Sequence, residues 1–291
     1  MPLISGRTLG EWDRAFREGL ISLHGANEAK AIARAAFRHL LGKDPLQLDG
    51  HTLLTKEQSS RAEAIQLRLV AGEPLQYVLG TVLFHGLELA VDPRVLIPRP
   101  ETEELVDLII HAQDMVSTRI VDVCTGSGCI ALALKQAFTG TAVTGCDISD
   151  GALDVARSNS AIMGLDVAWE KCDALGAGLN ALFTGQGRPG RTLVVSNPPY
   201  VPQQDKLRMD PHVLLHEPHL ALFVEDTDPH LFYRAIAKAF VPHAGVMDEL
   251  WFEAHHLCAP ATADEVRSQG FSRVEVLKDL SGNPRFIRAR K

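Results

Sequence analysis

The 291-residue sequence lacks paired cysteines and long apolar runs. Its five cysteines are odd in number and show no close paired spacing, which argues against a disulfide framework and against a zinc site. No apolar run is long enough to cross a bilayer. The first residues, Met1–Ile4, are not a basic segment followed by an apolar core, so no signal peptide is predicted. These absences together favour a reducing, cytoplasmic location.

Positive charge is also scarce. Lys and Arg number 29 against 36 Asp and Glu, which gives a formal net charge of -7 at pH 7. Proteins that hold long nucleic acids usually carry a basic face, because the phosphate backbone dominates that binding. The charge balance therefore argues against direct binding of long nucleic acid, although it leaves room for a local basic face. The composition, with 46% hydrophobic and 22% charged residues, is that of a globular protein.

The first quarter of the chain is predicted to be a small helical bundle. Apolar residues recur at three- and four-residue steps in its first helix, which gives that helix one apolar face: Leu9, Trp12, Phe16, Leu20 and Leu23. We expect breaks at Gly25 and at Gly42. A third helix is expected to begin at a Thr55–Gln58 capping box and to end at Gly72. A bundle of this size predicts a docking or stabilising domain.

Three segments are predicted: a helical domain over 1–72, a β-hairpin linker over 73–98 and an α/β domain over 99–291. In the linker the hydrophobic period changes to alternation, which is typical of two short strands about His85-Gly86. From Arg119 onward strands and helices alternate, and this predicts a parallel sheet. The last two strands, joined by a short turn at 281–284, are expected to be antiparallel.

Two loops of the larger domain can be recognised from composition. In the first, Pro100 is expected to begin a helix whose first turn is acidic, as suits a helix N-terminus. The preceding Arg99 has two interpretations: an ion pair with those acidic residues, or a place in a rigid loop that borders an active site. The second loop is the glycine-rich segment 176–191, which is predicted to lie on the surface.

A glycine-containing turn lies between the first strand and the first helix of the parallel sheet: Asp122-Val123-Cys124-Thr125-Gly126-Ser127-Gly128-Cys129. Its glycines let a ligand approach the backbone closely, and the helix N-terminus beyond favours an anionic group. Asp147 follows at the end of the second strand, the usual place of an acid that binds a ribose diol. These residues predict a nucleoside-bearing cofactor. The turn by itself fits S-adenosylmethionine, a nicotinamide dinucleotide or an ordinary tight turn.

The tetrapeptide Asn197-Pro198-Pro199-Tyr200, which follows an apolar strand, favours the first of these cofactors. The nitrogen of an amide or an aromatic amine is a weak nucleophile, and it reacts better when acceptors hold both of its hydrogens. The Asn197 side-chain oxygen and the Pro198 carbonyl can be these acceptors, because neither proline has an N–H. Tyr200 offers a flat face for stacking. Hydride transfer needs no such turn, so we expect a methyltransferase that positions a planar nitrogen in line with the methyl group.

Together these motifs resemble the release-factor glutamine methyltransferases. The resemblance covers nearly the whole chain and rests on Gly72–Tyr77, Leu96–Glu103, the glycine-containing turn, Asp147, Asn197–Tyr200 and His216-Glu217-Pro218. It implies a Rossmann-like seven-stranded methyltransferase domain with an N-terminal helical bundle and a hairpin linker. It also implies transfer of a methyl group from S-adenosyl-L-methionine to the glutamine amide in the Gly-Gly-Gln motif of peptide-chain release factors.

The same resemblance assigns roles to residues. The glutamine would be held by Asn197, Pro198, Pro199 and Tyr200. The cofactor would be contacted by Cys124, Thr125, Gly126, Ser127, Gly128, Asp147, Asp173, Ala174 and Asn197. Cys124 stands where the family usually has its first glycine, and a Cys there needs a negative φ or some strain. Asp173 has a strand-end cap as its alternative, and Ala174 stands where the family often has an aromatic residue. No metal site is expected.

Other functions stay open. The turn also resembles that of a related family, which methylates a glutamine of a large-subunit ribosomal protein. A DNA or RNA adenine methyltransferase would suit Asn197–Tyr200, but it would need a basic cleft and a target-recognition domain. A cofactor-binding module that docks on the translation machinery is a non-enzymatic alternative. His216 and Glu217 either belong to a loop that caps the sheet or shape the mouth for the Gly-Gly-Gln loop. We expect a monomer.

Overall fold

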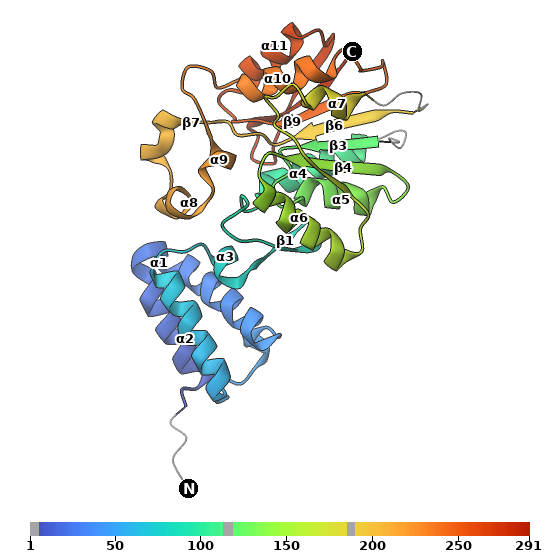
Figure 1. The fold of residues 1–291 in the computed structure, drawn as a ribbon. Helices are drawn as coiled ribbons and strands as arrows, with labels where there is room; N and C mark the ends of the chain where they lie inside the picture. Colours follow the sequence, from blue (N-terminus) through green and yellow to red (C-terminus); the bar gives the residue numbers. More distant parts are fainter. Residues whose placement is uncertain (1–5, 113–118, 185–189) are drawn as a thin grey trace. The chain divides into compact units, whose positions relative to one another are not determined.

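The computed structural model describes residues 6–112, 119–184 and 190–291. The chain divides into two compact units, which we call the helical unit (residues 1–81 and 210–216) and the sheet unit (residues 82–209 and 217–291). Figure 1 labels their helices and strands. A search of the described ranges finds no helix that is long and apolar enough to span a membrane.

The helical unit contains α1 (Leu9–Leu41), η1 (Pro45–Gln47), α2 (Lys56–Val70), α3 (Leu75–Leu79) and α8 (Pro211–His216). The predicted break in α1 is confirmed, because Gly25 leaves the helical conformation at φ 75° and ψ 169°. The predicted capping box of α2 is also confirmed: Thr55 and Gln58 each accept a hydrogen bond from the other's backbone N–H. The prediction that Leu23 belongs to the apolar face of this helix is wrong, since Leu23 is 46% exposed.

The helical unit extends to Thr81, beyond the end predicted at Gly72, because α3 packs on it. The guanidinium of Arg68 in α2 donates to the carbonyl oxygens of Tyr77 and Val78, both at 3.1 Å. The Val78 side chain is buried in the core of this unit. These contacts stabilise α3, whose residues were predicted to belong to the hairpin linker.

Helix α8 belongs to the helical unit although it lies far along the chain. His212 Nδ1 is 2.5 Å from the Gly72 carbonyl oxygen, and the His212 ring stacks on His24 with centroids 4.8 Å apart. The sequence pattern did not predict this helix, because its contacts join residues that are distant in sequence.

The sheet unit is built on a seven-stranded sheet with the order β10-β11-β9-β6-β3-β4-β5. The strands are β3 (Arg119–Val123), β4 (Ala142–Asp147), β5 (Ala168–Lys171), β6 (Thr192–Ser196), β9 (Glu249–Glu253), β10 (Arg273–Lys278) and β11 (Pro284–Arg290). Strands β9, β6, β3, β4 and β5 run parallel, whereas β11 is antiparallel to both of its neighbours. The predicted α/β class and the antiparallel final pair are confirmed.

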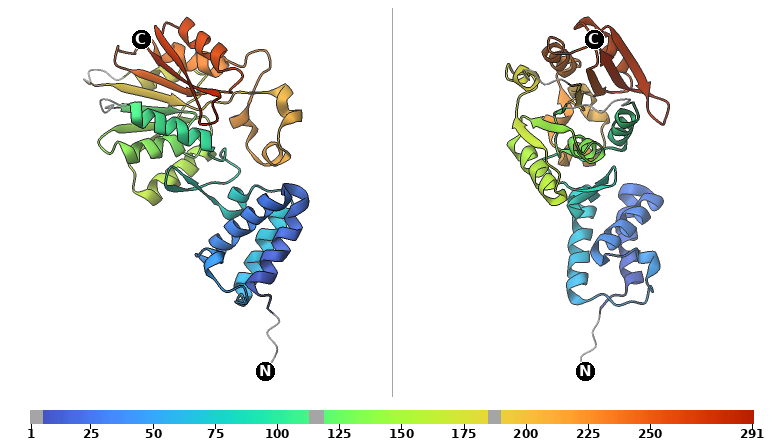
Figure 2. Two further views of the ribbon diagram at one scale, coloured as in Figure 1. Left: turned by 180° about the vertical axis from the view of Figure 1, so that it is seen from behind. Right: turned by 90° about the vertical axis from the view of Figure 1, so that its right-hand side faces the viewer.

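Helices cover both faces of this sheet (Figures 1 and 2). One face carries α4 (Pro100–Ala112), α5 (Cys129–Ala137) and α6 (Asp150–Met163), and the other carries α7 (Leu179–Phe183), α10 (Leu231–Phe240) and α11 (Ala259–Ser268). Successive strand residues alternate between the two cores: Ile120 and Trp251 face α4 and α5, whereas Val121 and Leu250 face α10 and α11. Both faces are therefore apolar, as a covered parallel sheet requires.

Short elements complete the sheet unit. The predicted hairpin is confirmed as β1 (Thr81–Phe84) and β2 (Leu87–Ala90), with His85 and Gly86 at positive φ in its turn. The elements that the sequence pattern did not predict are β7 (Val201–Pro202), η2 (Gln203–Arg208), α9 (His219–Leu222) and β8 (Phe223–Val224). The prediction of a surface loop over 176–191 is wrong at α7, because Leu179 and Phe183 are buried in the core that packs between the sheet and α10, called the α10 core below. Residues 185–189 of that loop lie outside the described residues.

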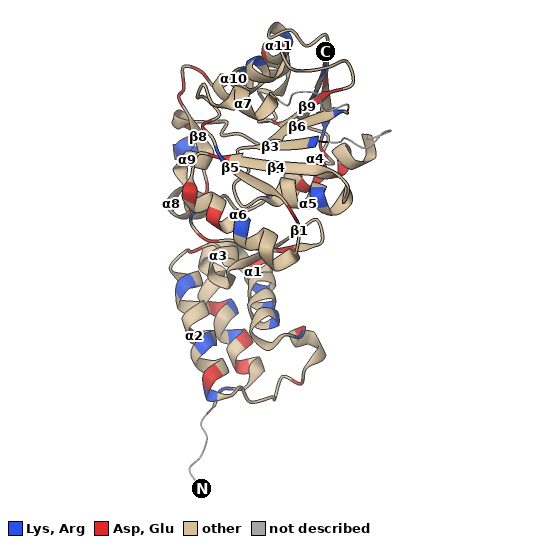
Figure 3. Ribbon diagram, turned by 45° about the vertical axis from the view of Figure 1, so that its right-hand side comes forward, with Lys and Arg blue, Asp and Glu red and all other residues tan. Residues whose placement is uncertain are grey.

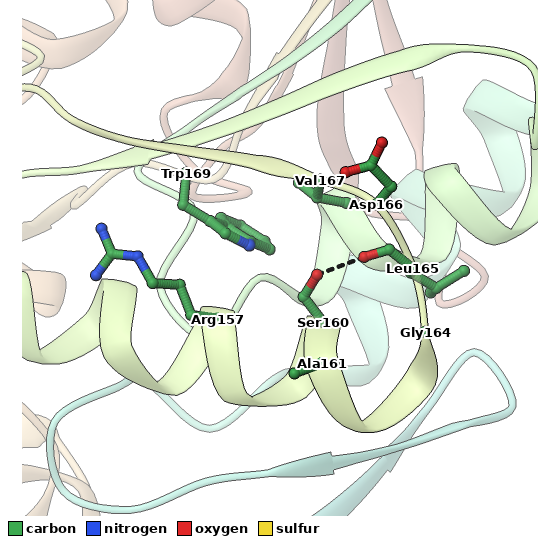
Figure 4. A pocket seen from close by; sticks show the side chains of 8 residues that line it. All are labelled: Arg157, Ser160, Ala161, Gly164, Leu165, Asp166, Val167 and Trp169. Atoms are coloured by element: carbon green, nitrogen blue, oxygen red, sulfur yellow. Dashed lines mark hydrogen bonds between the residues drawn. The ribbon is translucent and has the colours of Figure 1, made fainter.

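Trp169 of β5 explains two glycines of the sheet unit. It is the register partner of Gly145 in β4, where an added Cβ would lie 2.4 Å from the indole Cζ3. An added Cβ at Gly128 would lie 2.7 Å from the indole Cη2. Figure 4 shows the Trp169 ring between β5 and α6. The ring lines a pocket of about 370 Å³, and none of the predicted site residues lines that pocket. The indole therefore fills the space that side chains would need at both positions.

We expect Gly145→Ala to lower the free energy of unfolding by about 1–3 kcal/mol, because the new methyl group would overpack against Trp169. The control is Gly140→Ala, where an added Cβ has nothing within 4 Å among the described residues. That change should stay within about 0.5 kcal/mol. Urea unfolding of both variants measures the difference, and equal stabilities would contradict the packing argument.

Candidate functional site

The register of the parallel strands sets the geometry of the site. Val123 is the partner of Cys146 on one side and of Ser196 on the other, and Ser196 is the partner of Phe252. The next residues along these strands therefore reach the same edge of the sheet: Cys124, Asp147, Asn197 and Glu253. In open α/β sheets this carboxyl edge is where ligands bind.

Cys124 has a left-handed backbone, with φ 61°. A residue with a Cβ is uncommon there and costs roughly 1–2 kcal/mol. Of the two possibilities that the sequence left open, the strained one is observed. Burial raises the pKa of the Cys124 thiol well above its usual value, so the side chain stays neutral and packs against the α10 core.

Asp147 is held in place by backbone donors of the glycine-containing turn and of α6. Its Oδ2 accepts from the Gly126 N–H at 3.0 Å, and its Oδ1 accepts from the Ser149 N–H at 2.9 Å. Burial raises the pKa of Asp147, and these two donors lower it. Apart from Gly126 and its two chain neighbours, no described residue has an atom within 4 Å of where a Cβ on Gly126 would be. An oriented carboxylate beside an open glycine backbone fits the ribose of a nucleoside cofactor.

Asp122 supports the turn from below, a role that the sequence pattern did not reveal. It is fully buried, and its Oδ2 accepts from Thr125 Oγ1 at 2.5 Å and from the Ala131 N–H at 3.2 Å. Burial raises the pKa of Asp122 to about 7. These hydrogen bonds tie the turn to the first helical turns of α5.

Asp173 and Ala174 lie beyond the end of β5. Asp173 is exposed, and its Oδ1 accepts from the Leu175 N–H at 2.8 Å, so the carboxylate caps its own turn. That is the alternative interpretation of this residue. Ala174 is buried in the α10 core. A contact of either residue with an adenine stays a prediction.

Asn197 and Tyr200 are tied to α4 and β9 through hydrogen bonds that are buried or partly buried. Asn197 Nδ2 donates to Thr102 Oγ1 at 3.2 Å, and the Thr102 hydroxyl donates to Glu253 Oε2 at 2.7 Å. The Tyr200 hydroxyl donates to Glu253 Oε1 at 3.4 Å. Burial raises the pKa of Glu253 to about 7 and raises the pKa of Tyr200 well above its usual value. Sequence reasoning missed Thr102 and Glu253; an acid directly after the apolar run Leu250–Phe252 was the available signal.

The loop before α4 is held by Glu217. Arg99 pairs with Glu217 Oε1 at 2.5 Å, and the Ile97 N–H donates to Glu217 Oε2 at 3.1 Å. The interpretation that Arg99 pairs with the acidic residues of α4 is therefore wrong. Glu217 is 4% exposed, whereas the Arg99 side chain is 31% exposed, so water reaches the pair from the arginine side. Glu217 belongs to the His216-Glu217-Pro218 motif, and its carboxylate binds Ile97 and Arg99 of the Leu96–Glu103 motif. The two motifs therefore meet at this carboxylate.

Comparisons with known proteins cover both units. Residues 14–80 match the PrmC N-terminal domain, and residues 120–182 match a methyltransferase domain. The chain is 36% identical to the release factor glutamine methyltransferase of Flavobacterium psychrophilum, over 94% of this chain and 95% of that protein. It is 37% identical to the one of Deinococcus radiodurans, over 92% and 93%. The chain belongs to the release factor glutamine methyltransferase family.

Membership of the release factor glutamine methyltransferase family confirms the family resemblance and the predicted enzyme class. The seven-stranded sheet confirms the expected Rossmann-like methyltransferase fold. A solved structure of the hMettl16 catalytic domain, in complex with MAT2A 3′UTR hairpin 6, aligns with a TM-score of 0.50 and 15% identity over 81% of this chain and 82% of that one. At this identity the likeness concerns the fold alone. In the described ranges, no three His, Cys, Asp or Glu side chains gather as they would around a metal ion.

In this member of the release factor glutamine methyltransferase family, the strained turn can be tested at Cys124. We expect Cys124→Gly to be more stable than Cys124→Ala by about 1 kcal/mol, because both remove the thiol and only Ala keeps a Cβ at positive φ. Chemical denaturation of the two variants measures this difference. If the Ala variant were as stable as the Gly variant, the positive φ at this position would carry no strain.

Proposed function

We propose that this chain transfers a methyl group from S-adenosyl-L-methionine to the side-chain amide nitrogen of the glutamine in the Gly-Gly-Gln motif of peptide-chain release factors. The family relationship supports this substrate, because relatives that match 94% and 95% of the chain are named release factor glutamine methyltransferases. The observation that carries the proposal is the orientation of Asn197. Its Nδ2 is engaged by Thr102, and in the described part of the chain its Oδ1 has no hydrogen-bond partner.

The tetrapeptide would hold the substrate amide by two acceptors. Asn197 Oδ1 would accept one hydrogen of the glutamine NH₂, and the Pro198 carbonyl would accept the other. Pro198 and Pro199 have no N–H, so no backbone donor at these positions competes for the acceptors. The ring of Tyr200, whose hydroxyl is held by Glu253, would stack on the amide plane. The nitrogen would then be held in one orientation for in-line attack, which is the main catalytic contribution of such a site.

The cofactor would be held by the turn Cys124–Gly128 together with Asp147. The Asp147 carboxylate, oriented by the Gly126 N–H, would accept hydrogen bonds from the ribose hydroxyls. The open space at Gly126 would let the cofactor lie against the backbone. Asp173 and Ala174 would border the adenine. When bound, the cofactor supplies the electrophilic methyl carbon, while the protein residues bind and orient both reactants.

Charge supports a protein substrate over a long nucleic acid. The formal net charge is -7 at pH 7, and Figure 3 shows basic and acidic residues interspersed along both units. The docking role of the N-terminal helices, the monomeric state and the cytoplasmic location stay predictions.

The assay for this function uses the purified protein, S-adenosylmethionine labelled in its methyl group and a release factor. We expect label on the Gln of Gly-Gly-Gln and none when that Gln is replaced by Ala. Asn197→Ala should lower kcat by on the order of 10²-fold, as the loss of one oriented polar group does in other active sites. Asn180→Ala, an exposed change on α7, is the control and should keep full activity.

Two further substrates separate the alternatives in the same assay. Label on a large-subunit ribosomal protein would indicate the related glutamine methyltransferases, and label on an adenine-containing oligonucleotide would indicate a nucleic-acid enzyme. An unlabelled release factor, with cofactor binding intact, would overturn the proposed function.

Cofactor binding can be measured without the substrate. Asp147→Ala should raise the Kd for S-adenosylmethionine by about 10–100-fold, because hydrogen bonds to a charged group contribute roughly 1.5–3 kcal/mol. Asp150→Ala is the matched control, since this exposed carboxylate pairs with Lys171 on the surface. Isothermal titration calorimetry of both variants provides the comparison. An unchanged Kd for Asp147→Ala would show that another residue binds the ribose.

A further inference from the structure

Thr102 and Glu253 are buried behind the side chains that would hold the glutamine, and in the function proposed above neither contacts the substrate or the cofactor. Thr102 is 2% exposed and Glu253 is 1% exposed. They reach this place from α4 and from the end of β9, and they meet at 2.7 Å between Thr102 Oγ1 and Glu253 Oε2. A buried carboxylate is costly unless it is hydrogen-bonded, so its retention at this place calls for a reason.

The hydrogen bonds at Thr102 run in one direction. A threonine hydroxyl has a single hydrogen to donate. When that hydrogen goes to Glu253, Thr102 Oγ1 can only accept from its second neighbour, Asn197, at 3.2 Å. The amide arm that faces Thr102 must then be the NH₂ group, and the Asn197 oxygen takes the opposite side.

The opposite orientation of the amide would prevent substrate binding. If the Thr102 hydroxyl donated to Asn197, it would take the side-chain oxygen, and the Asn197 NH₂ would face the substrate. The glutamine amide nitrogen carries only donors, so two NH₂ groups would meet without a hydrogen bond between them. Such an unpaired polar contact costs free energy in a site shielded from water.

We propose that Glu253 and Thr102 are positioning residues, which fix the Asn197 side-chain amide so that its oxygen faces the substrate nitrogen. The proposal rests on the proposed function, since it concerns how that site selects an amide. Both residues act through Asn197. Glu253 also accepts from the Tyr200 hydroxyl, so one carboxylate orients both side chains that would hold the glutamine.

The ionisation of Glu253 controls this direction. Burial raises its pKa to about 7, the Thr102 and Tyr200 hydroxyls and the Arg285 charge lower it, and the Glu101 charge raises it. The Tyr233 hydroxyl donates to the Glu253 carbonyl at 3.1 Å, and the buried Cys129 thiol is close enough for its pKa to be raised by the Glu253 charge. An ionised carboxylate only accepts, so it compels Thr102 to donate. A protonated carboxyl has its own hydrogen to donate, and the direction at Thr102 is then no longer imposed.

The first test compares Thr102→Val with Thr102→Ser. Valine keeps the shape of threonine and removes the hydroxyl, whereas serine keeps the hydroxyl. We expect Thr102→Val to lower kcat for release-factor methylation by about 10–100-fold. Its Kd for S-adenosylmethionine should stay within about 2-fold, because Thr102 acts on Asn197 and not on the ribose carboxylate. Thr102→Ser should stay within about 3-fold of the wild type in both quantities. A Thr102→Val enzyme with unchanged kcat would overturn the proposal.

The second test uses pH. The wild-type kcat should rise between about pH 6 and pH 8 as Glu253 ionises. Glu253→Gln should remove this rise, because glutamine does not titrate. Its NH₂ group can donate to Thr102, as a protonated carboxyl can, so kcat should stay near the low-pH value of the wild type throughout this range. A pH profile of Glu253→Gln that matched the wild type would contradict the role of this carboxylate.

A third readout does not need methyl transfer. The side-chain amide signal of Asn197, observed by ¹⁵N NMR and assigned by comparison with Asn197→Ala, should shift with pH around a midpoint near 7 in the wild type and should stay constant in Glu253→Gln. If the wild type methylated no release factor while this signal behaved as expected, the proposed substrate would fail and the positioning role would stand. An Asn197 signal that titrates equally in both proteins would overturn the positioning role whatever the substrate.

Discussion

The site of this protein depends on the backbone register of its parallel strands. Because Val123, Cys146, Ser196 and Phe252 are held level by ladder hydrogen bonds, the following residues leave the sheet in one row. Side chains alternate between the faces of a strand, so a slip by one residue would exchange the apolar core set for the other face. The two cores that pack on the sheet, one under α4 and α5 and one under α10 and α11, oppose such a slip. The packing of the sheet therefore also maintains the spacing of the site.

The carboxyl edge combines this spacing with buried acids. Asp122 and Glu253 are both fully buried, and burial raises the pKa of each to about 7. A group whose pKa is raised by folding contributes stability at low pH and loses that contribution as the pH rises through its folded pKa. Between the ordinary carboxyl pKa and about 7, these two residues therefore make folding less favourable as the pH increases. They orient Thr125 and Thr102 at this cost, which is the kind of local instability that functional sites commonly carry.

Local signals predicted much of the fold. The capping box of Thr55 and Gln58, the break at Gly25 and the turn at His85-Gly86 depend on residues within a few positions of one another, and all three were confirmed. Helices α3 and α7 were missed because distant contacts stabilise them. Arg68 holds the carbonyls of α3, and the α10 core buries Leu179 and Phe183. The predicted ion pair of Arg99 with the acidic residues of α4 was also wrong, because its actual partner, Glu217, is 118 positions away in the sequence.

The sequence by itself determined which chemical groups are present and where each strand presents them: a glycine-containing turn, an acid at the end of the second strand and a turn of acceptors at Asn197–Tyr200. These are enough to indicate the reaction, because each motif works through residues adjacent in the chain. The tertiary structure alone decided how Asn197 is oriented. Thr102 and Glu253 are 95 and 56 positions from it, and no local spacing brings three such groups together. A hydrogen bond's direction depends on which neighbour supplies the hydrogen, and only the folded chain determines those neighbours.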